Sequence, residues 1–192
     1  MANTVLLNNV DHKDLRIDTA RRPGLGDDVM YAPTFPAEFR NVQSHYPIVF
    51  RKDAGGGFQP VALFGFEDAQ NLFLGADGWD APYVPLAIER QPFLIGVQGG
   101  EPMVHVDLNS PRVHGGGEPV FLEHGGTTPL LERASSVLLA LYDGLQATPA
   151  FVDALLEHAL LESFTLDVEL GDGAQHRLAG FYTIHQERQA AL

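Results

Sequence analysis

The chain has 192 residues, of which 45% are hydrophobic and 19% charged, so it contains enough apolar material for the core of a folded domain. Its formal net charge of −13, with 12 Lys and Arg, repels phosphate backbones and anionic lipids, so we expect neither nucleic-acid binding nor membrane docking. Cysteine is absent, which excludes disulfides, thiolate catalysis and cysteine-ligated zinc or iron–sulfur sites.

The residues before about position 119 are predicted to form mainly short antiparallel strands, because brief apolar runs there alternate with proline and glycine. A short helix is predicted over 36–47, since Pro36 suits a first helical turn and Pro47 ends the pattern. Strands are expected at 48–51, 59–66, 71–74, 93–97 and 103–108. The segment 81–93 fits either a short helix or an extended stretch, and GADGW (75–79) and QGGEP (98–102) are predicted turns.

Two helices are predicted after residue 126. Thr128 can cap a helix that begins at Pro129, and apolar residues recur every three or four positions over 130–145. Thr148 and Pro149 repeat the same start signal, which predicts a second helix. Because only a short link separates the two helices, they are expected to pack against each other.

A strand pair is predicted to follow the helices. Apolar and polar residues alternate in FTLDVEL (164–170), which GDGAQ (171–175) turns toward a partner strand over 176–179. HQERQAAL (185–192) is predicted to close the chain as a short helix. The predicted fold class is therefore α+β, with mainly antiparallel strands in the N-terminal part and two packed helices and a strand pair in the C-terminal part. We expect one domain over residues 1–192, with the loop at 114–117 as the best internal boundary.

A run of three glycines at 55–57 raises the question of a phosphate site. A phosphate-binding loop needs a helix N-terminus directly after its glycines. Here the strand-like FQPVALFGF (58–66) follows, and the sequence has no GKS, GKT, GxGxxG or GxSxG motif. The glycines therefore predict a hairpin loop, and we expect neither a nucleotide site nor a serine nucleophile.

His105 and Asp107 form the best candidate metal-ligand pair. They alternate on a predicted strand and so share one face, as two ligands of a two-His-one-carboxylate iron site would. The same spacing recurs elsewhere by chance, at His12 with Asp14 and at His185 with Glu187. A third ligand would have to come from His114, His124 or His176. We expect no metal and no cofactor, with histidines at the surface or in hydrogen bonds, and keep the iron site as an alternative.

Aromatic residues and prolines gather between positions 64 and 93. One interpretation is a corner of the core, since aromatic side chains dominate cores. The other is a partner or ligand surface with Trp79, Tyr83 and Arg90 as anchors, because these residue types dominate binding hot spots. The remaining polar side chains are expected on outer faces of the molecule, with no reactive pocket among them.

Several stretches of the sequence resemble the bacterial SapC family, namely YPIVF (46–50), PVALFGFED (60–68), QNLFL (70–74), GWDAPYVPLAIERQPFLIG (78–96) and GFYTIHQERQAAL (180–192). NNVDHKDLR (8–16) and FPAEFRNVQSHYPIVF (35–50) fit as well, so the resemblance spans nearly the whole chain. It implies an association with paracrystalline bacterial surface layers. It also implies genes beside those of outer-membrane nutrient receptors, halogenase-like flavoproteins and cupin-like proteins. The resemblance supplies no catalytic residues, and family members vary around MVHVDLN (103–109), which counts against the iron site.

The expected function is that of a non-enzymatic accessory or interaction protein of the SapC type, linked to surface-layer or outer-membrane nutrient-uptake systems. Two alternatives stay open: a cupin-like or iron-dependent oxygenase that uses His105 and Asp107, and a small-molecule or sugar sensor that binds at Trp79 and Tyr83. The expected partner is an unidentified protein or a second copy of this chain.

The expected location is the cytoplasm, without membrane insertion. The N-terminus lacks the pattern of a secretory signal, and no apolar run reaches the roughly 18 residues that span a bilayer. Export by a non-classical route stays open.

Overall fold

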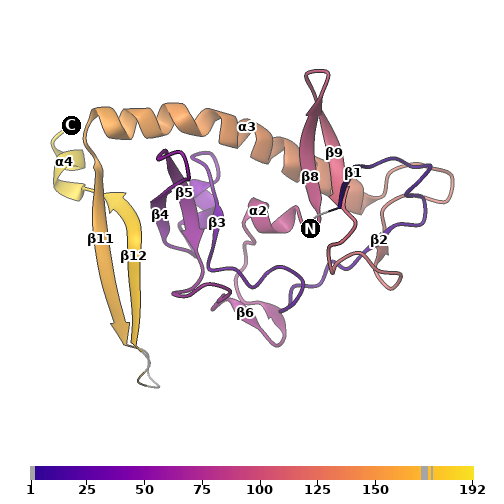
Figure 1. Cartoon of the computed structure of the whole chain (residues 1–192), viewed down its shortest axis with the longest axis horizontal. Coiled ribbons are helices and arrows are strands. Elements are labelled where there is room, and N and C mark those ends of the chain that lie inside the picture. Colours follow the sequence, from indigo (N-terminus) through magenta and orange to yellow (C-terminus); the bar gives the residue numbers. More distant parts are fainter. Residues whose placement is uncertain (1–2, 170–172, 174) are drawn as a thin grey trace. The chain divides into compact units, whose positions relative to one another are not determined.

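Helices and antiparallel sheets make up the computed structural model, which describes residues 3–169, 173 and 175–192 (Figure 1). This confirms the predicted α+β class. The chain divides into two compact units, each built from two separate segments: Met1–Asp28 with Leu74–Asp143, and Val29–Phe73 with Gly144–Leu192. The loop at 114–117, which the sequence favoured as an internal boundary, lies inside the first unit.

The first unit contains a three-stranded antiparallel sheet in the order β1-β9-β8. Its strands are β1 (Thr4–Leu6), β9 (Glu101–Asp107) and β8 (Phe93–Gln98). Two short strand pairs accompany it, β2 (Arg16–Ile17) with β10 (Glu118–Pro119) and β6 (Leu74–Gly75) with β7 (Gly78–Trp79). The predicted turns at GADGW and QGGEP connect β6 to β7 and β8 to β9, and the ambiguous segment 81–93 contains the helix α2 (Leu86–Glu89).

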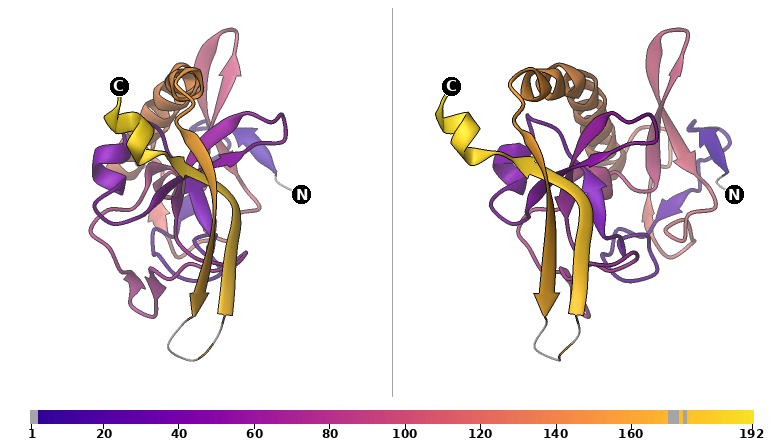
Figure 2. Two further views of the ribbon diagram at one scale, coloured as in Figure 1. Left: turned by 90° about the vertical axis from the view of Figure 1, so that its left-hand side faces the viewer. Right: turned by 60° about the vertical axis from the view of Figure 1, so that its left-hand side comes forward.

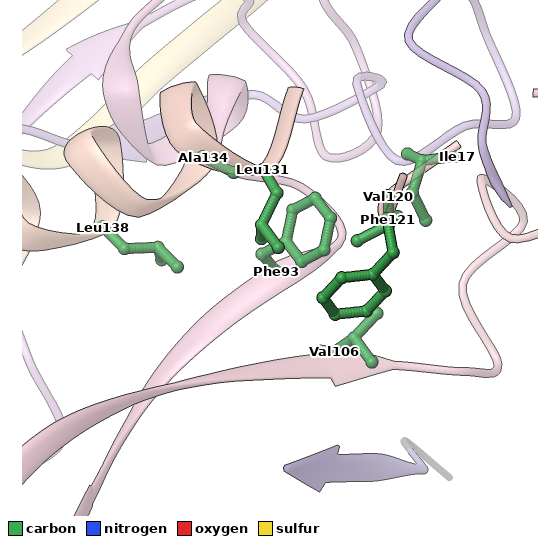
Figure 3. Packing of buried hydrophobic residues seen from close by; sticks show 8 residues of the cluster. All are labelled: Ile17, Phe93, Val106, Val120, Phe121, Leu131, Ala134 and Leu138. Carbon is green, nitrogen blue, oxygen red and sulfur yellow. The ribbon is translucent and has the colours of Figure 1, made fainter. Parts of the chain in front are cut away.

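The core of the first unit is a cluster of eight buried apolar residues (Figure 3): Ile17, Phe93, Val106, Val120, Phe121, Leu131, Ala134 and Leu138. They come from β2, β8, β9, the segment after β10 and the beginning of the long helix α3 (Pro129–Glu157). Burial of side chains of this size contributes about 1.5–3 kcal/mol each to folding. The base of the β8–β9 hairpin is therefore fixed by its apolar side chains.

The second unit is built on a five-stranded antiparallel sheet in the order β11-β12-β4-β5-β3. The strands are β3 (Tyr31–Pro33), β4 (Ile48–Lys52), β5 (Phe58–Leu63), β11 (Leu161–Glu169) and β12 (Gln175–Ile184). β12 pairs with β4 only at Phe181 and Tyr182, so the β11–β12 ribbon continues past the end of β4 (Figure 2). The predicted short helices are present as α1 (Phe39–Val42) and α4 (Gln186–Ala190).

One predicted strand is wrong. Only Leu74 of the stretch 71–74 lies in a strand, because the side-chain oxygen of Asn71 accepts a hydrogen bond from the backbone of Phe73 at 3.0 Å and turns the chain. Leu170, predicted to end a strand, and residues 171, 172 and 174 of the predicted GDGAQ turn lie outside the described residues.

The two predicted helices form one continuous helix, α3, of 29 residues, so the predicted break is wrong. The start at Thr128 is confirmed, since its hydroxyl accepts a hydrogen bond from the Leu131 amide. The hydroxyl of Thr148 donates instead to the Gly144 carbonyl at 2.8 Å, inside the helix. Pro149 removes a single helical hydrogen bond, and the neighbouring turns continue past it.

Candidate functional site

Asp27 and Arg112 are the most deeply buried oppositely charged pair that the described residues contain, with 0% and 1% of their side chains exposed. Nη2 of Arg112 donates to both carboxylate oxygens of Asp27, at 2.6 and 2.7 Å. Nη1 of Arg112 donates to the backbone carbonyls of Asp18 and Ala20, at 3.0 and 2.8 Å. The pair therefore ties the segment after β2 to the loop after β9, across 85 positions of sequence.

Arg21 shares the carboxylate of Asp27. Its Nη1 donates to Asp27 Oδ1 at 3.1 Å and to the Ile88 carbonyl at 3.2 Å, and its Nη2 donates to the Glu89 carbonyl at 3.2 Å. Burial lowers the pKa of Arg21, and the nearby carboxylate of Asp27 opposes that effect. One buried carboxylate thus faces two guanidinium groups, those of Arg21 and Arg112.

Glu89 at the end of α2 and Arg133 in the first part of α3 form a second, bidentate pair. Arg133 Nε donates to Oε1 at 2.7 Å and its Nη2 donates to Oε2 at 2.8 Å. This hydrogen bonding raises the pKa of Arg133. The Arg133 side chain is 62% exposed, so the pair contributes little to stability but holds a guanidinium group in place.

A pocket of about 160 Å³ lies among these groups in the first unit. Its charged lining is Arg21, Glu89 and Arg133, and its apolar lining includes Phe93, Ala134 and Val137. The apolar residues belong to β8 and α3, which the core holds in place. The pocket therefore combines fixed cationic groups with a rigid hydrocarbon wall.

Asp18, next to this cluster in sequence, accepts hydrogen bonds from the Ala20 amide at 2.9 Å and from Arg22 at 2.6 Å, and lies 3.1 Å from His114 Nε2. The Ala20 amide, followed by His114 and Arg22, lowers the pKa of Asp18 to about 2. Because this value lies below that of an unfolded aspartate, Asp18 stabilises the fold above about pH 4, and this contribution is lost as the pH falls toward 2.

One face of the β8–β9 hairpin is apolar along its length. This face is buried in the core at the base of the hairpin and becomes more exposed toward the turn. Phe93 and Val106 pair at its base, where both are buried. On the same face the next pairs are Ile95 with Val104, both partly buried, and Val97 with Pro102, where Val97 is 59% exposed. β1 pairs only with positions 105–107 of β9, so the outer half of the hairpin extends beyond β1 (Figure 1).

The comparison with protein families shows to which family this chain belongs. The model of the SapC family matches residues 7–192. The chain belongs to the SapC family. Among curated proteins and solved structures, none matches it.

The residues predicted to form a partner surface in this SapC protein are half-buried. Trp79 pairs with Leu74 in the β6–β7 hairpin. Nη1 of Arg90 donates to the Phe93 carbonyl at 2.8 Å, and burial lowers the pKa of Arg90. Arg90 therefore holds the connection between α2 and β8. The role of Trp79, Tyr83 and Arg90 in binding stays a prediction.

The aromatic residues between positions 64 and 93 of this SapC protein are divided between the two units. Phe93 belongs to the core of the first unit. Phe64 and Phe73 pack edge-on against Tyr46 in the second unit, with ring centroids at 5.2 and 4.7 Å. Nearness in sequence therefore did not place these aromatic residues in one unit.

His105 and Asp107 make local contacts. His105 Nδ1 lies 3.1 Å from the Met103 carbonyl, and the imidazole covers Gly96 of β8 so closely that a Cβ there would lie 2.5 Å from its Cε1 atom. Asp107 Oδ1 accepts hydrogen bonds from the backbone amides of Asn3 and Asn109, at 2.9 and 3.0 Å. Within the described part of the chain, no three His, Asp or Glu residues are grouped as metal ligands.

The glycine loop at 55–57 joins β4 to β5, which confirms the predicted hairpin. Asp53 Oδ1 accepts hydrogen bonds from the amides of Gly55 and Gly57, at 2.8 and 2.9 Å. The loop amides that would cradle an anion are thus occupied by a carboxylate of the chain itself.

The prediction that polar side chains lie on outer faces is wrong for Asp27 and Arg112, which are fully buried. Sequence reasoning missed both, and it missed Arg21. The only local signal is that RR at 21–22 stands close to DD at 27–28. Nothing nearby in sequence indicates Arg112 as the main partner.

Among the described residues, no helix is sufficiently long and apolar to span a bilayer.

Proposed function

We propose that this protein is a non-enzymatic accessory or interaction protein of the SapC type, linked to surface-layer or outer-membrane nutrient-uptake systems. Membership of the SapC family supports this proposal. The observation that carries it is the β8–β9 hairpin, whose core face forms an apolar stripe of Ile95, Val104, Val97 and Pro102. Ile95 and Val104 pack against the core, and the stripe continues into solvent at Val97 and Pro102. We propose that a protein partner covers this stripe.

The edge of β8 is suited to receive such a partner. β8 is an outer strand of its sheet, and its sequence, FLIGVQ, has no charged residue and no proline. Exposed edge strands usually carry lysine, proline or another device that prevents strand addition. Their absence from β8, in a chain with net charge −13, supports pairing with another strand.

The hydrogen-bond alternation of the hairpin indicates which groups would pair. Phe93 bonds Arg90 through both its amide and its carbonyl, so the backbone groups of Phe93 point away from β9. In an antiparallel ladder the same orientation recurs at every second residue, which places the amides and carbonyls of Ile95 and Val97 on the outer edge. The partner strand would thus bond Ile95 and Val97 and bury their side chains.

The test compares Val97→Asp with Gln98→Asp as the matched control. Both variants add one negative charge to the exposed end of β8, but only position 97 lies on the apolar face. We expect the wild-type protein, used as bait in its native cells, to retain a surface-layer or outer-membrane receptor protein. The purified partner should bind Val97→Asp at least about tenfold more weakly, because a buried valine contributes about 1.5–3 kcal/mol. Gln98→Asp should bind like the wild type.

Two results would contradict the proposal. The first is partner binding that responds equally to both variants. The second is near-stoichiometric iron in the purified protein that disappears in His105→Ala, since this would favour the oxygenase alternative. Sedimentation of the protein alone identifies a second copy as the partner if Val97→Asp abolishes self-association.

A further inference from the structure

We infer that the pocket beside Arg21 and Arg133 binds a small organic anion, a carboxylate with a short hydrocarbon body. This site lies apart from the outer half of the β8–β9 hairpin and goes beyond the proposed partner binding. Its residues come only from the first unit.

The charges around the pocket favour an anion. Three guanidinium groups, those of Arg21, Arg112 and Arg133, are paired with two carboxylates, those of Asp27 and Glu89. One positive charge therefore remains in this cluster, within a chain whose net charge is −13. Because the Arg21 side chain, which lines the pocket, is only 18% exposed, an anion in the pocket would meet a weakly screened cation.

Arg133 offers a donor in a defined direction. Its Nε and Nη2 are held by Glu89, and its Nη1 makes no hydrogen bond to the described residues. Glu89 fixes the plane of this guanidinium group, so less side-chain entropy is lost when a ligand binds. The Nη1 group can thus donate to a ligand carboxylate, while the guanidinium group of Arg21, which also lines the pocket, adds positive charge.

The apolar wall of the pocket selects the rest of the ligand. Phe93, Ala134 and Val137 belong to this wall but are nearly closed off, with 1%, 7% and 2% of each residue exposed, and Figure 3 shows Phe93 and Ala134 within the packed core. Leu130, which also lines the pocket, is only partly buried and offers apolar surface to a ligand. Such a wall gains free energy from hydrocarbon and none from a hydrated inorganic ion. The pocket volume of about 160 Å³ corresponds to about five water molecules, which suits an anion of roughly six non-hydrogen atoms.

Butanoate is the probe of choice, with 1-butanol, butylammonium and inorganic phosphate as comparisons. Binding to the full-length protein is followed by the NMR shifts of backbone amides, with those of Phe93 and Ala134 as local reporters. Butanoate is expected to shift these two amides saturably and to bind at least about tenfold more tightly than 1-butanol, equivalent to about 1.4 kcal/mol. Butylammonium and phosphate are expected to bind more weakly still.

Two substitutions in the pocket locate the site, and a third substitution outside it serves as the control. Arg133→Gln removes the exposed donor and is expected to weaken butanoate binding about tenfold. Ala134→Leu fills the pocket and is expected to abolish binding. Arg177→Gln removes a guanidinium group that is 70% exposed in the second unit, and should leave binding unchanged.

Arg133→Gln tests whether butanoate binds in this pocket even if Ala134→Leu fails to fold. Equal affinity of Arg133→Gln and Arg177→Gln for butanoate would overturn the inference. Phosphate binding as tight as that of butanoate, or no response to butanoate at millimolar concentrations, would do the same. None of these outcomes depends on the partner of the β8–β9 hairpin, so the two proposals can fail separately.

Discussion

A single carboxylate, that of Asp27, organises much of the first unit. It accepts hydrogen bonds from Arg112, Arg21 and the backbone amide of Arg22. Through these donors it links the segment after β2 to the loop after β9 and, by way of Arg21, to the backbone at the end of α2. Removal of Arg112 would leave this buried carboxylate with Arg21 and the Arg22 amide as its remaining donors. It would also leave the carbonyls of Asp18 and Ala20 without the donor that Arg112 supplies, and buried polar groups that lose a partner are costly.

Arg112→Met is therefore expected to lower the free energy of unfolding by about 3–5 kcal/mol. Urea denaturation measures this value. Arg177→Gln, which breaks the exposed ion pair with Asp167, is the control and should change the value by less than about 1 kcal/mol. A loss for Arg112→Met as small as that of the control would contradict the role given to the buried pair.

The contrast between Asp53 and Asp27 shows which residue contacts a sequence reveals. Asp53 binds amides two and four positions away, so the turn pattern was sufficient to predict its loop. Asp27 binds Arg112 across 85 positions, and no local pattern specifies such a distant partner. The pocket was missed for the same reason, since Arg21, Glu89 and Arg133 come from three separate segments.

At the scale of elements, predictions succeeded where periodicity and turn chemistry agreed. The β8–β9 hairpin and the start of α3 at Thr128 follow from alternation and from a capping residue. The break at Thr148 and Pro149 did not occur, because the same dipeptide that begins a helix can also lie inside one when threonine bonds the preceding turn. Tertiary packing decided between these two states, with Val152 and Leu155 buried in the turns that follow.

The helix α3 should become more stable when proline is removed. Pro149→Ala restores an amide donor for the Leu145 carbonyl and is expected to raise the free energy of unfolding by about 1–3 kcal/mol. Chemical denaturation provides the measurement. The neighbouring Ala150→Gly is the control, with an expected decrease of about 1 kcal/mol. A decrease for Pro149→Ala would mean that the predicted break at this position persists in solution.

At the scale of the whole molecule, the two units are interleaved in sequence. Each unit needs two segments, and the boundary between Asp143 and Gly144 falls inside α3. No contiguous fragment consists of one complete unit alone, since any fragment that contains both segments of one unit also contains part of the other. We therefore propose that residues 1–192 fold as one cooperative domain, because loss of either unit would fray the helix on which the other depends.

Cooperative unfolding predicts that probes in the two units report the same transition. Trp79, the single tryptophan, reports on the first unit by its fluorescence. The NMR amide signals of β4 and β5 report on the second unit. Their midpoints in urea should coincide, and Trp79→Phe confirms the origin of the fluorescence change. Two separated midpoints would divide the chain into independent domains.

The imidazole of His105 over Gly96 has a consequence for sequence variation. A methyl group at position 96 would collide with that ring, so Gly96→Ala is tolerated only if the ring moves or position 105 becomes smaller. SapC proteins that replace His105 by a smaller residue are therefore released from the need for glycine on the facing strand. Substitutions at positions 96 and 105 are therefore expected to occur together in SapC sequences. Such covariation would indicate that the two residues are in contact across the hairpin.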